Sequence, residues 1–129
     1  MKTSGGGERG QAMVEFALVL PLLLAVVTAI AEFGIAFSNY LALVDAARAG
    51  ARVAAVSADA TNPAADTEAA IRAAASDLNQ TNLVVPPPQT TWSAGSPVTV
   101  TAKYPYKISI FGMAVYSGWL QSSTTERVE

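Results

Sequence analysis

The feature that most constrains this chain is an apolar run at residues 16–31 that contains no charged side chain. A helix over residues 12–31 would be roughly 30 Å long, which is close to the thickness of the hydrocarbon core of a membrane. The sequence therefore predicts that the chain is anchored in a membrane or passes through one. Glu15 lies inside the predicted helix at 12–31, just before the charge-free run, and a carboxylate in a membrane costs about 2.5–3.5 kcal/mol at the bilayer centre and less near its edge. Its presence needs an explanation.

The composition excludes many classes of enzyme and binding protein. The 129 residues allow one modest domain, and there is no cysteine and no histidine. Thiol chemistry, disulfides, haem ligation, the usual zinc sites and histidine-dependent serine hydrolases are therefore excluded. The acidic residues are scattered, the glycines at 5–7 begin no phosphate-binding loop, and the net charge of −2 includes no basic cluster. We expect no enzymatic activity, no cofactor, no metal site and no nucleic-acid partner.

The chain begins with a polar, glycine-rich stretch at residues 1–9, which predicts a flexible leader. Lys2 and Arg9 place positive charge on the N-terminal side of the apolar segment. Positive charge there favours a cytoplasmic N terminus, with the bulk of the chain on the other side of the membrane.

The apolar helix is expected to continue beyond the membrane, because residues 32–56 contain no proline and are rich in helix-forming residues. A helix over residues 11–56 would be roughly 69 Å long. Pro21 is either a tolerated kink or a point where the helix loosens when the subunit leaves the bilayer, and Gly34 and Gly50 also permit bending. The second half is amphipathic, and one face carries the apolar side chains of Phe33, Phe37, Leu41, Val44, Ala47, Ala51 and Ala55. The alanines at 46, 47, 49, 51, 54 and 55 allow close approach of another element, which is either the small domain of the same chain or a partner.

The remaining residues predict an α+β fold, in which a second short helix and a small antiparallel sheet of about three strands accompany the long helix. The second helix, at residues 66–79, follows a cap at Thr61 or Asn62 and an entry through Pro63. The clearest strand is 97–104, in which apolar and polar residues alternate, and it is expected to pair with residues 120–128. A short strand at 82–85 is ended by the prolines at 86–88.

The segment between the two main strands allows two interpretations. Residues 104–106, Tyr-Pro-Tyr, predict a turn, and an apolar stretch punctuated by glycine follows at 108–120. This stretch either covers the sheet or presents apolar side chains to a partner or to the bilayer surface. The side chains concerned are Phe111, Met113, Val115, Tyr116 and Trp119.

The residues at the start of the apolar helix carry a family resemblance. Gly10 is followed by four residues and then by Glu15 and Phe16, and this spacing resembles the processing signal of type IV pilin-like proteins. Residues 9–24 as a whole resemble the TadE-like pseudopilins of tight-adherence (Flp) pilus systems. Residues 40–55 and 98–106 are similar to the helix continuation and the C-terminal part of that family.

The resemblance implies a membrane precursor with a leader peptide at 1–10, a transmembrane helix at 11–31 and an extracytoplasmic pilin-like domain at 32–129. A prepilin peptidase would cut between Gly10 and Gln11, and Glu15 and Phe16 would belong to the processing and assembly motif. The expected partners are that peptidase, other pilin or pseudopilin subunits, the pilus assembly platform and the lipid bilayer of the bacterial inner membrane. The protein would act as a minor pilin or a pilus-biogenesis factor, either in the membrane or incorporated into a pilus.

Cleavage would also explain Glu15. Gln11 would then carry a free α-amino group about one helical turn away, and Glu15 could pair with it or with the N terminus of a neighbouring subunit. The alternative is that Glu15 reaches the cytoplasmic headgroups.

Two other functional classes stay open. The chain could be an uncleaved single-pass accessory protein, or a secreted binding protein whose residues 1–31 are a signal peptide. The small residues of Ala29-Ile30-Ala31 fit signal-peptide cleavage. The first residue of the mature protein distinguishes the three classes, because it would be Gln11, the intact start or Glu32.

Overall fold

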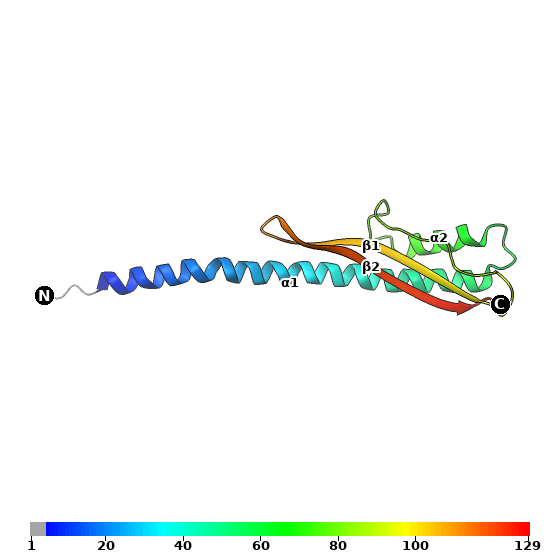
Figure 1. Ribbon diagram of the computed structural model, residues 1–129, viewed down its shortest axis with the longest axis horizontal. Helices are drawn as coiled ribbons and strands as arrows, with labels where there is room; N and C mark the ends of the chain where they lie inside the picture. Colours follow the sequence, from blue (N-terminus) through cyan, green and yellow to red (C-terminus); the bar gives the residue numbers. More distant parts are fainter. Residues whose placement is uncertain (1–4) are drawn as a thin grey trace.

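The computed structural model describes residues 5–129. Four elements follow one another as α1 (Gly5–Val56), α2 (Pro63–Ala74), β1 (Pro97–Ile110) and β2 (Met113–Arg127). Figure 1 shows α1 as a long rod, with α2 and the β1–β2 hairpin lying along its C-terminal half. The turn of the hairpin points back toward the N-terminal half of α1. This is the α+β fold that the sequence predicts, with one strand fewer.

The long helix has no interruption. It contains 52 residues, which corresponds to about 78 Å, and it continues through Pro21, Gly34 and Gly50. It begins at Gly5, so residues 5–9 are helical and the prediction of a flexible leader is wrong for them. Extending an existing helix by one residue is far easier than nucleating one, so the apolar helix carries its polar leader with it. Lys2 belongs to residues 1–4, which lie outside the described residues.

The side of α1 that packs on the domain carries most of the alanines that were predicted to allow close approach. The buried side chains are small apart from one leucine: Leu43, Ala46, Ala47, Ala51 and Ala54. Phe33, Phe37 and Leu41, which belong to the predicted apolar face, are 64%, 64% and 48% exposed. The small residues are used because α2 and β1 approach α1 closely. A Cβ atom on Gly50 would lie only 2.4 Å from Cγ1 of Ile71.

The short helix α2 begins as predicted and ends earlier. The Asn62 side-chain oxygen accepts a hydrogen bond from the Ala65 N–H at 3.2 Å, and Pro63 is the first helical residue. The helix ends at Ala74 instead of residue 79. Gln80 is one reason, because its side-chain amide donates to the carbonyl oxygens of Ala75 at 2.7 Å and Leu78 at 3.1 Å and thereby stabilises a turn.

The sheet confirms the predicted pairing of its two main strands. Tyr104 lies opposite Leu120 and Pro97 opposite Arg127 in an antiparallel register. The predicted alternation also holds, because the side chains of Val98, Val100 and Ala102 are buried against α1 and α2. The threonines between them face away from the core, and two hydroxyl pairs link the strands there, Thr99 with Thr125 and Thr101 with Ser123.

The predicted third strand is reduced to two isolated contacts with β1. Val84 exchanges two backbone hydrogen bonds with Lys103, both 2.9 Å long, and Gln89 exchanges two with Thr99. Between them lie the prolines at 86–88, which have no N–H groups to donate to a ladder. The sheet therefore has two strands, where about three were expected.

The turn between the strands lies later than predicted. Pro105 is inside β1, opposite Trp119, and the chain reverses at Phe111 and Gly112, whose φ angles are 52° and 79°. Proline is tolerated because the backbone groups of Lys103 point away from β2, toward Val84, and those of residue 105 point the same way. The missing N–H of Pro105 therefore removes no hydrogen bond between the strands.

Candidate processing and assembly segment

The four residues of the predicted processing and assembly motif lie in the first turns of α1, and all are exposed. Gln11 and Glu15 are one turn apart on the same side of the helix, and the Gln11 Nε2 atom donates a hydrogen bond of 3.0 Å to Glu15 Oε1. Phe16 projects from a different side because a helix turns by about 100° per residue. The structure thus brings Gln11 and Glu15 together, with Gly10 directly before them.

Gly10 has no structural role in this fold. A Cβ atom added there would find nothing within 4 Å, and the residue needs no positive φ angle. In a helix, glycine is about 0.8–1 kcal/mol less favourable than alanine. Gly7 and Gly34 in the same helix are equally unconfined, so Gly10 is distinguished by its place five residues before Glu15.

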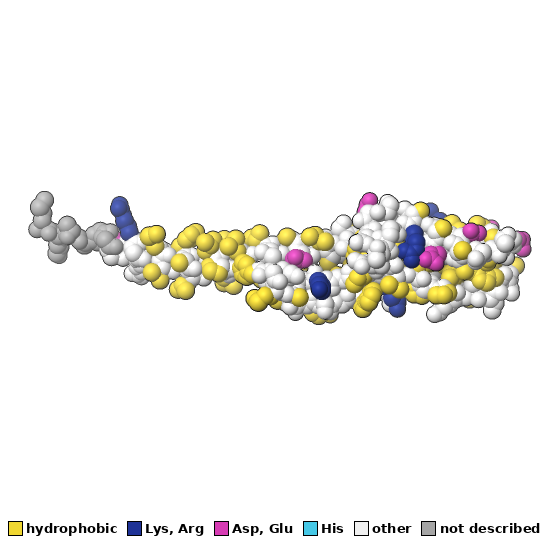
Figure 2. All heavy atoms as spheres, turned by 90° about the horizontal axis from the view of Figure 1, so that it is seen from above, with side chains coloured by type: hydrophobic (Ala, Val, Ile, Leu, Met, Phe, Trp, Pro, Cys, Tyr) yellow, Lys and Arg dark blue, Asp and Glu magenta, His cyan; other side chains and the backbone are white. Residues whose placement is uncertain are grey.

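The apolar half of α1 lies outside the core of the domain. It is long and apolar enough to cross a membrane, and its most apolar stretch is not buried in the protein. Figure 2 shows hydrophobic side chains along this half of the helix. The hydroxyl group of Thr28 donates to the Leu24 carbonyl oxygen at 2.8 Å, so it is satisfied without water. This segment indicates a membrane-anchored protein.

A second exposed apolar surface begins near the end of the charge-free run and continues along α1 beyond it. We call it the outward stripe, and it consists of Ile30, Phe33, Phe37 and Leu41. The spacings of three, four and four residues place these side chains on one side of the helix, and Phe33 also lines the groove beneath the hairpin. The apolar periodicity predicted this face from the sequence, but it did not indicate what would cover it.

The hairpin presents its apolar residues and does not cover the sheet with them. We call residues 108–119 the hairpin tip. Phe111, Met113, Val115, Tyr116 and Trp119 are all exposed, as in the second of the two interpretations of this stretch.

Between the hairpin and α1 runs an open groove of about 400 Å³. Its lining consists of Ala29, Phe33, Tyr106, Ile108, Ile110, Val115 and Tyr116. The rings of Tyr106 and Tyr116 lie 5.7 Å apart. Desolvation and then the neighbouring Tyr116 raise the pKa of Tyr106 above its ordinary value.

Comparison with known protein families gives a match to the first part of the chain. Residues 10–52 match the model of a family described as TadE-like protein, which confirms the resemblance that the sequence showed in this part of the chain. The matched region begins at Gly10 and includes Gln11, Glu15, Phe16 and most of α1. No curated protein and no solved structure matches the chain. The resemblance at residues 98–106 lies outside the matched region and stays a prediction.

Proposed function

Starting from the TadE-like segment at residues 10–52, we propose that this chain is a pseudopilin of a tight-adherence (Flp) pilus or a related secretion system. The family match and the long apolar helix fit a protein associated with such a pilus. In the proposal the chain is made as a membrane precursor with its N terminus in the cytoplasm. A prepilin peptidase cuts it between Gly10 and Gln11, and the product is a minor pilin or a pilus-biogenesis protein.

The observation that carries the proposed cleavage is the family match, which begins at Gly10, five residues before Glu15. The structure leaves room for a peptidase, because nothing in the described residues would contact a side chain at position 10. Gly7 and Gly34 have the same free space, so the spacing to Glu15 is what distinguishes Gly10.

The outward stripe supports assembly with other subunits. Phe33 and Phe37 lie after Glu32, beyond the charge-free run, and each is 64% exposed, although Phe33 also lines the groove beneath the hairpin. Large apolar side chains that stay exposed along a helix favour packing against a second helix. In the proposal the stripe packs on neighbouring subunits after the helix leaves the bilayer.

The continuity of α1 argues against removal of residues 1–31 as a signal peptide. The helix runs through Ala31 and Glu32 without a break, and Ala29 lines the groove beneath the hairpin. Cleavage after Ala31 would divide one helix and remove one wall of that groove.

The cleavage is tested with two matched variants, Gly10→Val and Gly7→Val, each co-expressed with the peptidase. Both glycines lie in α1 with nothing within 4 Å of an added Cβ atom, so the two changes are alike for the fold. We expect Gly7→Val to be shortened to a product that begins at Gln11 and Gly10→Val to remain at precursor length. The mass and N-terminal sequence of each product provide the measurement.

Three outcomes would refute the proposed processing. Normal shortening of Gly10→Val would show that Gly10 is not recognised. A wild-type product that begins at Glu32 would indicate a signal peptide, and an intact wild-type chain would indicate an uncleaved accessory protein.

The orientation is tested separately on intact spheroplasts, where added protease should digest the region after Val56. Protection of that region would place the domain in the cytoplasm.

A further inference from the structure

The hairpin tip is an apolar surface that the proposed function does not use. No charged residue lies between Lys107 and Glu126. At the turn, Phe111 is 58% and Met113 is 68% exposed, and the structure gives them no partner among the described residues. Water is a poor environment for such a cluster, so a second surface is expected to cover it.

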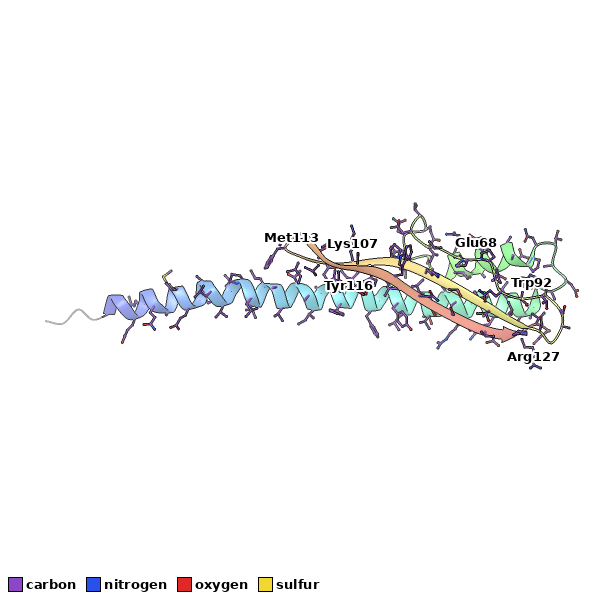
Figure 3. All side chains as sticks on the ribbon, in the orientation of Figure 1. Glu68, Trp92, Lys107, Met113, Tyr116 and Arg127 are labelled. Atoms are coloured by element: carbon purple, nitrogen blue, oxygen red, sulfur yellow. The ribbon has the colours of Figure 1, made fainter. Side chains whose placement is uncertain are left out.

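The hairpin tip lies level with the apolar part of α1. Ile110 and Val115, on either side of the turn, line the groove together with Ala29 of the helix. Ala29 lies within the charge-free run, three residues or about 4.5 Å before Glu32. Figure 1 and Figure 3 show the turn, with Met113 at its end, pointing toward the N-terminal half of α1. When the apolar run lies in a bilayer, the turn is therefore at the height of the lipid.

The order of side chains along the hairpin matches the change of polarity across a membrane surface. Phe111 and Met113 are outermost, and Tyr106, Tyr116 and Trp119 follow farther up the two strands. Tyrosine and tryptophan are enriched at the level of the lipid headgroups. Lys107 is exposed at the same height as Ser117, and Figure 3 shows its side chain on the side of the hairpin away from α1. A lysine in this position can reach lipid phosphates.

The backbone at the turn gives an independent argument. A two-residue turn with positive φ at both central positions is usually made by Asn-Gly or Asp-Gly. Here the first position is Phe111, at φ 52°, which is an unfavourable conformation for a bulky residue. A polar residue would suit this backbone better in water. The strained and exposed phenylalanine is explained if its side chain is needed in an apolar environment.

We propose that the hairpin tip inserts into the leaflet from which α1 emerges, so that the membrane form of the protein contacts lipid at two places. The inference rests on the membrane anchoring that forms part of the proposed function. Lipid is favoured over a second copy of the chain as the covering surface, because the tip lies level with the apolar run of its own helix. The second contact would fix the domain against the bilayer and limit its rotation about α1.

The absence of cysteine allows a direct test with single spin labels on the full-length chain in phosphatidylcholine and phosphatidylglycerol vesicles. Three exposed apolar residues are replaced one at a time, in the variants Leu18→Cys, Phe111→Cys and Val56→Cys. The label at position 18 is the reference for a site within the membrane span. The label at position 56, at the far end of α1, is the reference for a site exposed to water. Collision of each label with oxygen, which partitions into lipid, is compared with its collision with a water-soluble nickel chelate.

We expect the label at position 111 to collide severalfold more with oxygen than with the chelate, as at position 18, and the label at position 56 to show the reverse. The proposal is overturned if position 111 behaves like position 56 while position 18 reports lipid. It is also overturned if position 111 becomes shielded from the chelate only at a high protein-to-lipid ratio, with dipolar broadening, because a second copy would then cover it. If position 18 reports water, the membrane anchoring of the proposed function fails as well.

Native Trp119 provides a second measurement that leaves the turn unchanged. In a Trp92→Phe variant it is the only tryptophan, and lipids brominated near the headgroup should quench it more strongly than lipids brominated near the bilayer centre. Equal and weak quenching by both lipids would contradict the proposed depth of the hairpin.

Discussion

Replacement of Gly50 by alanine tests the close contact on which the packing of the domain depends. The new Cβ atom would lie 2.4 Å from Cγ1 and 2.9 Å from Cδ1 of Ile71, and 3.2 Å from Cγ1 of Val100. Ile71 is fully buried, so it has no free space into which it can move. Inserting a methyl group into a packed core in this way typically costs about 1–3 kcal/mol of unfolding free energy.

The change also removes a glycine from a helix interior, which contributes about 0.8–1 kcal/mol in the opposite direction. Gly34→Ala gives the same helical gain without the clash, because nothing lies within 4 Å of its Cβ position. Gly34→Ala is therefore the matched control. Relative to it, Gly50→Ala should have a free energy of unfolding lower by about 1–3 kcal/mol.

The assay is urea unfolding of the full chain in mild detergent, followed by the fluorescence of Trp92 and Trp119, which both lie outside α1. A third variant combines Gly50→Ala with Ile71→Ala, which removes the two nearest atoms of the clash. The double variant should be no less stable than Ile71→Ala alone, although loss of the isoleucine itself costs about 2–5 kcal/mol. Equal unfolding midpoints for Gly50→Ala and Gly34→Ala would refute the reasoning.

Three further predictions concern the sheet, the outward stripe and Glu15. Removal of residues 120–129 should abolish the strand signal in circular dichroism, because it deletes the partner of residues 97–104 and the buried Val128; full strand content after the truncation would contradict the pairing. Phe37→Glu should leave the thermal midpoint of the domain unchanged and prevent recovery in pilus or assembly-complex pull-downs, whereas Val56→Glu, an equally exposed control off the stripe, should be recovered normally. Glu15→Ala should still insert into the membrane, since the segment becomes more apolar, but should not be recovered with its partners; wild-type recovery would leave only an interaction of Glu15 with headgroups.

The parts of the fold that the sequence predicted correctly depend on local patterns. The alternation around Val98 and Val100 set both the buried face and the register with residues 120–128. The length of α1 followed from the absence of proline between residues 32 and 56, and the start of α2 followed from Asn62 and Pro63. In each case the chemistry that determines the structure lies within a few residues of its effect.

The incorrect predictions concern places where contacts with a distant part of the chain determine the structure. Pro105 taken by itself predicts a turn. Its missing N–H would interrupt the β1–β2 ladder only if the backbone of residue 105 faced β2. The pairing of Lys103 with Val84 shows that this backbone faces the other way. The true turn at Phe111 and Gly112 lacks the usual polar residue, so turn chemistry alone does not find it. For the candidate site, the sequence identified Gly10, Gln11, Glu15 and Phe16, but the space around Gly10 could be judged only with the whole helix and domain in place.

The sequence showed two apolar sides on α1, and the structure shows which of them the domain covers. One side of α1 carries large apolar residues, and another carries alanine and glycine. A domain as small as this can cover only one of these two sides. Burying the small side brings α2 and the sheet close to the helix axis, as the Gly50–Ile71 contact requires, and it leaves Phe33 and Phe37 outside. An isolated soluble protein would gain free energy from the opposite choice, because about 0.8 kcal/mol accompanies each buried methylene group. The arrangement is favourable for a chain whose large apolar side is covered by something else, and the proposed function supplies such a cover, with lipid along the charge-free run and the helices of other subunits beyond it.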